Sequence, residues 1–197
     1  MKNVKIRKVS ITAVFGALAF VLMVLEFPLP FIIPSFIKLD FSEIPALIVS
    51  FAYGPLYGVA VCFVKNIIHL PLSATSGVGE LANFILGTFF VGTAGFVYKL
   101  KHSKKGALIA SVIGGILMAL ISLPVNYFIT YPFYSNFMPM DAIIGMYKAI
   151  LPTCDTLLKS LIIFNIPFTL FKGIIDAAVC FAIYKRISRF LNKILDK

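Results

Sequence analysis

The sequence is short of charge, of histidine and of cysteine. Only 13% of the 197 residues are charged, and the acidic residues number eight. The two histidines, His69 and His102, lie far apart and no H-E-x-x-H motif occurs, which argues against a metal site. The three cysteines, Cys62, Cys154 and Cys180, are scattered and odd in number, so they imply no disulfide framework.

Motifs typical of enzymes are missing as well. There is no G-x-x-x-x-G-K-[ST] motif, so the chain does not hydrolyse a nucleotide through a phosphate-binding loop. His69 and Asp155 could belong to a Ser/His/Asp arrangement, but nothing places a serine beside them. The sequence therefore predicts a protein that is not an enzyme and that needs no metal or cofactor.

The apolar content is too high for a single soluble core. Hydrophobic residues make up 60% of the chain, and the mean hydropathy is +0.98. Lipid must cover this excess, so we expect an integral membrane protein. Because no linker, low-complexity tract or internal repeat divides the sequence, residues 1–197 are expected to form a single membrane domain.

The basic residues indicate the orientation in the membrane. They are concentrated in segments 2–8, 99–105 and 185–197, each of which adjoins a long apolar run. Cytoplasmic segments are enriched in lysine and arginine, so all three are expected to be cytoplasmic, and the net charge of +10 needs no nucleic-acid partner. A cleaved signal peptide fits the N-terminus less well, since the apolar run continues past "ALA" at 17–19 to Ile37.

The apolar runs and their breakers predict six membrane helices. The first two basic segments are both cytoplasmic, which requires an even number of spans between them, so one apolar block must be split. Gly54-Pro55 marks the break, and the helix before it is too short to cross a hydrocarbon core that needs about 20 residues. Neighbouring helices must shield it, or it must tilt. The expected helices are 9–27, 42–53, 55–70, 80–98, 106–130 and 160–185.

The remaining long segment, 131–159, contains several prolines and is expected to be external, with an interfacial helix over 142–151. The prediction is thus an all-α integral membrane bundle of six transmembrane helices with both termini cytoplasmic.

Polar residues gather in the outer half of this bundle. The stretch "FIKLDFSEIPALI", residues 36–48, places Asp40 and Phe41 at the outer mouth, where Lys38 and Glu43 could be interfacial anchors. Such a charged lip would border a site that opens to the outside.

Two further helices bring polar side chains to the same half. Glu80 and Asn83 are three residues apart, hence on one helix face, and Asn126 lies near the end of helix 106–130. An interhelical hydrogen bond and a ligand contact are equally compatible with Asn126. Lys65 and His69, on helix 55–70, are interpreted as structural or interfacial.

Helix 160–185 carries a polar stripe. Asn165, Thr169, Lys172 and Asp176 follow one another at spacings of four, three and four, which puts them on one face. A lysine or aspartate near the bilayer centre is disfavoured by about 2.5–3.5 kcal/mol on insertion scales, so something must compensate. An ion pair between Lys172 and Asp176 would do so, but it leaves Asn165 and Thr169 unexplained. A cavity filled by water or ligand is favoured.

Four motifs, "KLDFSEIPALI", "GPLYGVAVCFVKNIIHL", "SGVGELANFILG" and "NIPFTLFKG", resemble the riboflavin-binding S components of energy-coupling-factor (ECF) vitamin transporters. The resemblance covers about residues 10–185. It implies a six-helix bundle in a prokaryotic plasma membrane that binds the vitamin from outside. A separate module of one transmembrane coupling protein and two ATPase subunits then supplies the energy.

The resemblance also implies roles for particular residues. The family's Ala-x-x-x-Ala pattern, which packs against the coupling protein, matches Ala13 and Ala17. The family motif N-x-P-F-N-x-x-K-G has Thr169 in its second Asn place in this sequence. The implied riboflavin contacts are Asp40, Phe41, Glu80, Asn83, Asn126, Asn165, Thr169 and Lys172.

These residues suit riboflavin, whose flat ring has an imide-like edge and whose side chain carries hydroxyls. Asn amides match the edge, carboxylates accept from hydroxyls, and aromatic side chains cover the ring face. S components for thiamine, biotin, pantothenate or folate are the alternatives within the family, and the lack of tryptophan does not separate them. A structural membrane protein, whose polar stripe only holds helices together, is the alternative outside it.

Overall fold

The computed structural model describes residues 2–195, so Lys197 of the basic tail lies outside the described residues. The long helices are α1 (Lys2–Val24), α2 (Glu43–Tyr53), α3 (Pro55–His69), α4 (Val78–Leu100), α5 (Lys104–Val125) and α9 (Ile166–Leu195). The short elements are β1 (Phe27–Pro28), β2 (Lys38–Leu39), the 3-10 turn η1 (Leu70–Leu72), the π-helical turns η2 (Asn126–Thr130) and η3 (Leu161–Asn165), α6 (Tyr131–Tyr134), α7 (Met140–Ile150) and α8 (Leu157–Ser160).

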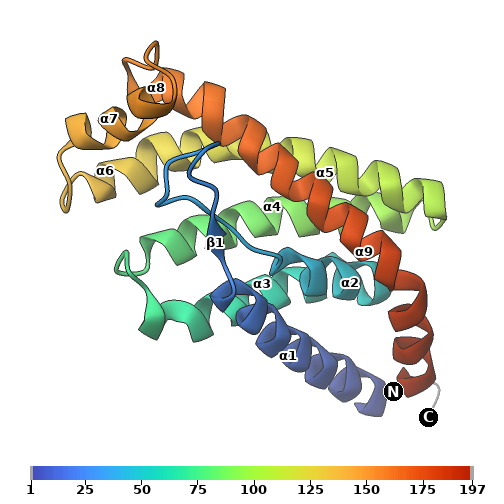
Figure 1. Ribbon diagram of the computed structural model, residues 1–197. Coiled ribbons are helices and arrows are strands. Elements are labelled where there is room, and N and C mark those ends of the chain that lie inside the picture. The colour runs from blue at the N-terminus through green and yellow to red at the C-terminus, as the bar shows by residue number, and fades with distance from the viewer. Residues whose placement is uncertain (1, 196–197) are drawn as a thin grey trace.

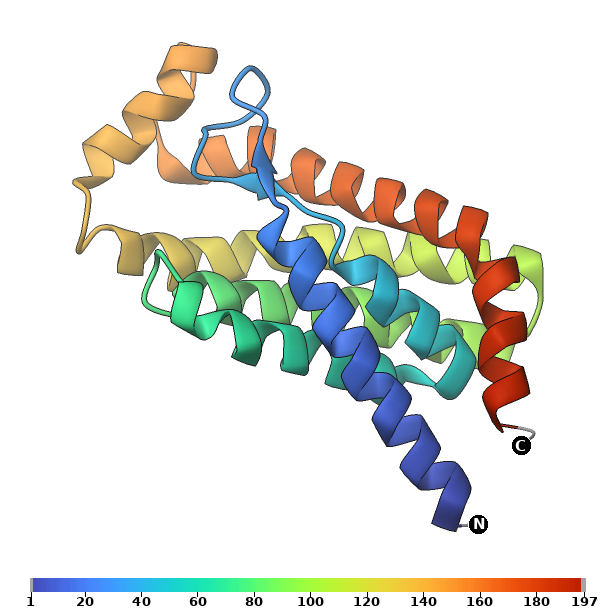
Figure 2. The same ribbon diagram turned by 60° about the horizontal axis from the view of Figure 1, so that its bottom comes forward.

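The predicted all-α membrane bundle is confirmed. Five helical segments are long and apolar enough to cross a membrane, and the shorter α2 completes the predicted set. The N-terminal end of α1 and the C-terminal end of α9 lie at one end of the bundle, and α6, α7 and α8 lie at the other (Figures 1 and 2). We call the end with α6 to α8 the outer end, because the charge pattern predicts that it faces outside.

The short helix α2 is enclosed by its neighbours. It packs against α1, α3, α4 and α9, and every residue of α2 except Ala52 is buried. Its 11 residues reach about 16 Å, roughly half of a hydrocarbon core of about 30 Å. Gly54, with a φ of 104°, makes the turn into α3 at the predicted break, a conformation that glycine adopts without strain. The start of α2 therefore lies inside the bundle and not at its outer surface.

The segment between α1 and α2 differs from the expectation. Helix α1 ends at Val24, three residues before its predicted end at 27, and β1 pairs antiparallel with β2. Phe27 lies opposite Leu39 and Pro28 opposite Lys38. This hairpin lays residues 29–37 across the outer part of the bundle (Figure 2).

Two π-helical turns shape the outer ends of the longest helices. Helix α5 continues through η2 into α6, so the helical rod reaches Tyr134 instead of ending at 130. Helix α9 is likewise preceded by α8 and η3. Pro132 lies just after η2 and Pro167 just after η3. Since proline lacks an N–H donor and clashes with the preceding turn, a local π adjustment accommodates it.

The orientation of the ends can be tested by labelling. His102 precedes α5 and Asn136 follows α6, so a helical rod of 31 residues separates them. We expect a membrane-impermeant thiol reagent to label Asn136→Cys on intact cells, and His102→Cys only after permeabilisation. The native cysteines are buried and give a low background. Labelling of both positions from outside would contradict cytoplasmic termini.

Candidate functional site

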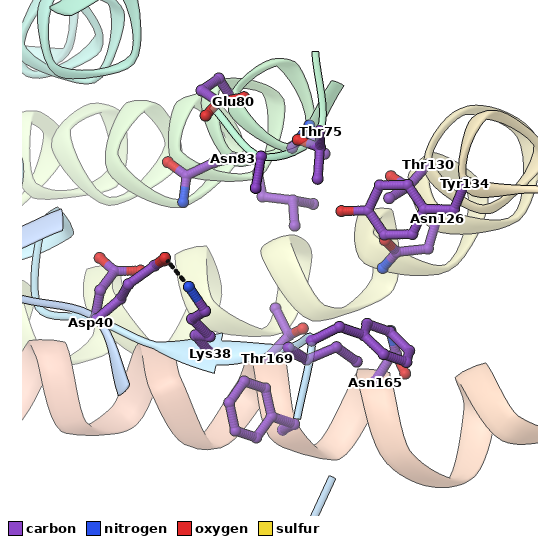
Figure 3. A pocket seen from close by; sticks show the side chains of 18 of the residues that line it. Lys38, Asp40, Thr75, Glu80, Asn83, Asn126, Thr130, Tyr134, Asn165 and Thr169 are labelled. Atoms are coloured by element: carbon purple, nitrogen blue, oxygen red, sulfur yellow. Dashed lines mark hydrogen bonds and ion pairs between the residues drawn. The ribbon is translucent and has the colours of Figure 1, made fainter. Parts of the chain in front are cut away.

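A pocket of about 880 Å³ opens within the outer half of the bundle. Its walls are α4, the continuous helix α5–η2–α6, the helix η3–α9, the hairpin between α1 and α2, and α7, which contributes Ile143 and Met146. This volume falls in the range of about 300–1,000 Å³ that is usual for small-molecule sites. Figure 3 shows polar side chains converging on the pocket from these walls.

The two π-helical turns each present an asparagine to the pocket. Asn126 belongs to η2 and Asn165 to η3, and both line the pocket (Figure 3). Such turns bulge the helix by one residue and recur at functional sites. Neither the Asn126 amide nor the Thr169 hydroxyl, which also lines the pocket, has a hydrogen-bond partner among the described residues. The interhelical hydrogen bond considered for Asn126 is therefore not formed, and both groups are free for a ligand.

Asn165 is already engaged on one side. The Tyr147 hydroxyl donates to Asn165 Oδ1 at 2.7 Å, and Asn165 Nδ2 donates to the Tyr131 hydroxyl oxygen at 3.2 Å. The amide of Asn165 is buried and still borders the pocket.

The α4 wall contributes the predicted pair Glu80 and Asn83, and both line the pocket. His69 Nδ1 lies 2.8 Å from Glu80 Oε1, and the Ser73 hydroxyl donates to Glu80 Oε2 at 2.6 Å. Asn66 Nδ2 donates to Asn83 Oδ1 at 3.3 Å. These partners hold the two side chains in place on one face of α4.

Buried charged side chains close the inner end of the pocket. Lys172 Nζ lies 2.6 Å from Asp40 Oδ2 and 3.1 Å from Glu43 Oε2, and Lys65 Nζ lies 2.6 Å from Glu43 Oε1. The Ser42 hydroxyl accepts from Lys65 and donates to Asp40. We call Asp40, Ser42, Glu43, Lys65 and Lys172 the inner charge cluster. Because Asp40 and Glu43 come at the start of the short α2, the cluster lies deep in the bundle.

This geometry corrects the predicted lip. Asp40 lines the inner end of the pocket, and Phe41 packs against the Phe27 ring, 6.2 Å between centroids, and against the apolar core. Glu43 is 2% exposed and is not an interfacial anchor. Lys38 lies on β2 and forms an ion pair of 2.5 Å with Glu26.

The alternative pairing of the α9 stripe is also wrong. The carboxylate partners of Lys172 are Asp40 and Glu43. Both carboxylate oxygens of Asp176 are buried without a hydrogen bond within the part of the chain that the structure describes. The stripe thus faces other elements of the bundle and does not neutralise itself.

Residues 7–184 match the family model "ECF transporter, substrate-specific component". The chain belongs to this family. It is accordingly a multi-pass plasma-membrane protein of a transport system and not an enzyme, and its family works with an ECF module.

Named relatives and a solved structure agree with this membership. "Riboflavin transporter RibU" of Staphylococcus aureus is 34% identical over 92% of this chain and 90% of its own. "Riboflavin transporter FmnP" of Bacillus subtilis is 32% identical over 96% of each chain. A solved structure described as the S component of a bacterial ECF transporter is 33% identical, with a TM-score of 0.76 over 97% of this chain and 99% of the solved one.

Several pocket residues of this S component escaped the sequence analysis. Thr75, Phe36, Tyr131, Tyr134 and Phe168 all line the pocket, and the Tyr134 hydroxyl points into it (Figure 3). Three of them follow the η2 turn or lie in the hairpin, where the predicted helices had ended. The aromatic run "NYFITYPFY" was the available signal, because a helix that continues through it brings Tyr131 and Tyr134 to the pocket.

The small residues of α1 divide between two faces. Ala13 and Ala17 are exposed on the outside of the bundle, while Gly16 faces α3. A Cβ atom at Gly16 would lie 2.5 Å from Val64 Cγ1, so Gly16 is needed for packing inside this chain. Ala13 and Ala17 have no such internal role and stay available to a partner.

Proposed function

We propose that this S component binds riboflavin in the outer pocket, for uptake driven by a module of one transmembrane coupling protein and two ATPase subunits. The observation that carries the proposal is a pocket of suitable size in which amide and hydroxyl groups without partners face apolar walls. The names of the relatives from S. aureus and B. subtilis support riboflavin over other vitamins.

The walls match the chemistry of the ligand. The isoalloxazine ring of riboflavin needs apolar cover, which Phe36, Phe168 and Met118 supply from three different elements. Its imide edge has an N–H between two carbonyls, and an Asn amide can both donate to it and accept from it. Asn126 and Asn165 are proposed for that edge.

The ribityl chain is a row of hydroxyls that can donate and accept. Glu80 and Asn83 on α4 and Thr169 on α9 are proposed as its partners, and Asp40 and Lys172 bound the site at its inner end. Phe41 packs against the apolar core and does not line the pocket, so it is not proposed as a ligand contact.

The charges of the pocket favour an uncharged ligand. Among the described residues that line it, both lysines are in ion pairs, Lys38 with Glu26 and Lys172 with Asp40 and Glu43. Glu80 adds a further carboxylate. A phosphate group would therefore meet excess negative charge and no unpaired ammonium group, in surroundings where burial strengthens the repulsion.

Titration of the purified protein tests both the choice of riboflavin and the preference for an uncharged ligand. We expect tight riboflavin binding, followed by flavin fluorescence quenching, and binding of riboflavin 5′-phosphate at least about tenfold weaker, which is about 1.4 kcal/mol. Thiamine, biotin, pantothenate and folate should not compete. Binding of one of these four vitamins without binding of riboflavin would show that the protein is specific for that vitamin. Equal binding of riboflavin and riboflavin 5′-phosphate would refute only the argument from the charges of the pocket.

A further inference from the structure

A closed ring of hydrogen bonds lies beside the pocket. It joins Tyr131 of α6, Tyr147 of α7 and Asn165 of η3, whose exposed fractions are 1%, 0% and 5%. The Tyr147 hydroxyl donates to Asn165 Oδ1, Asn165 Nδ2 donates to the Tyr131 oxygen, and the two hydroxyls bond to each other. Three separate outer elements are thus linked through three polar groups.

The ring lies on the side of the pocket where Ile143 and Met146 of α7 also line it. Tyr131 and Asn165 line the pocket, whereas Tyr147 lies behind Asn165 and packs on the Phe164 ring at 5.5 Å. Phe36 from the hairpin meets Tyr131 and Tyr147 edge to face, at 6.2 and 6.1 Å between centroids. Burial, with Tyr131 adding to it, raises the pKa of Tyr147 far above its ordinary value, so its hydroxyl stays protonated.

The ring uses only half of the hydrogen-bonding capacity of Asn165. An Asn amide has two N–H donors and two acceptor sites on its oxygen. One N–H is taken by Tyr131 and one acceptor site by Tyr147. One N–H donor and one acceptor site of the Asn165 amide remain for a group in the pocket. The bonds to Tyr131 and Tyr147 hold the amide in one orientation, so these two free sites have fixed positions.

We propose that Tyr147, which does not line the pocket, is a positioning residue that preorganises Asn165 for the ligand. The proposal rests on the proposed function, since riboflavin is the probe. Fixing a polar group in its bound geometry before the ligand arrives raises affinity, because less conformational freedom is lost on binding. Helix α7, which lines the pocket with Ile143 and Met146, thereby also fixes a polar group of the binding site through the Tyr147 hydroxyl.

A purely structural role for Tyr147 predicts different behaviour. A buried tyrosine hydroxyl needs a partner in any case, so its loss can lower stability without changing the ligand contacts. A positioning role predicts a loss of affinity that depends on Asn165. The two roles are therefore distinguished by one comparison. If Tyr147 positions Asn165, removing the Tyr147 hydroxyl lowers the affinity for riboflavin only when the Asn165 amide is present.

The test is a double-mutant cycle on Kd for riboflavin, with thermal unfolding measured alongside. Tyr147→Phe should raise Kd about three- to tenfold, the range that one neutral hydrogen bond supports. In an Asn165→Ala background the same change should alter Kd less than about twofold. Asn165→Ser replaces Asn165→Ala if the latter binds too weakly to titrate. Tyr127→Phe is the matched control, since Tyr127 is 38% exposed and should leave Kd unchanged.

Two results would overturn the proposal: an unchanged Kd for Tyr147→Phe, whether or not its unfolding temperature falls, or an equal effect of this change on Kd in both backgrounds. Absence of riboflavin binding by the unmodified protein is a separate outcome, which refutes the proposed function itself.

Discussion

Ala17→Trp should abolish riboflavin uptake by cells that supply an ECF module, while the purified protein binds riboflavin within about twofold of the unmodified chain. Ala13 and Ala17 lie one turn apart on the exposed face of α1, and neither lines the pocket, which α1 reaches with Met23 and Val24 at its C-terminal end. Small residues at this spacing allow a second helix to approach closely, and a tryptophan would hold it away. Uptake of labelled riboflavin and binding in detergent are the two measurements.

A tryptophan elsewhere on the surface controls for general effects of bulk. Leu120 on α5 is 57% exposed, so Leu120→Trp should leave both uptake and binding intact. Because both alanines are exposed, loss of binding through disrupted internal packing is not expected. Full uptake by Ala17→Trp would show that this face of α1 meets only lipid and that the coupling surface lies elsewhere.

The parts of the fold that were predictable depend on local patterns. The break between α2 and α3 follows from Gly54-Pro55, and the polar face of α9 follows from spacings of four and three along one helix. These signals act over a few residues, so the sequence displays them directly. Asn165, Thr169 and Lys172 reach the pocket for that reason.

The parts that were not predictable depend on distant partners. Lys172 pairs with Asp40, 132 positions away, whereas its sequence neighbour Asp176 offered the plausible local pair. Strands β1 and β2 have two residues each, which is too few to show a periodic pattern in the sequence. They are recognised only in the fold, where Phe27 lies opposite Leu39 and Pro28 opposite Lys38. Tyr147 lay in a segment assigned to the exterior, and only the fold brings its hydroxyl to Asn165.

The inner charge cluster links the architecture of the bundle to its site. The four charged side chains, Asp40, Glu43, Lys65 and Lys172, sum to zero and tie the start of α2 to α3 and α9. Only Asp40, Glu43 and Lys172 also line the pocket. Lys65 is 0% exposed and lies behind them, so it can be changed without removing a pocket wall.

Lys65→Met should therefore destabilise the protein by about 3–5 kcal/mol, because it leaves the Glu43 side of the cluster with an uncompensated buried charge. The control Lys38→Met breaks an ion pair whose side chains are 41% and 28% exposed, and it should cost only about 0–1 kcal/mol. Unfolding free energies from denaturant titration in detergent, without riboflavin, compare the two.

A second change distinguishes charge from packing at this position. Adding Glu43→Gln to Lys65→Met removes the opposite charge as well, so the double variant should regain a large part of the lost stability. If the double variant is no more stable than Lys65→Met alone, the methylene stem of Lys65 matters more than its ammonium group. If Lys65→Met is as mild as Lys38→Met, the cluster does not hold α2 in place. In that case the short helix is retained by its apolar contacts with α1, α3, α4 and α9.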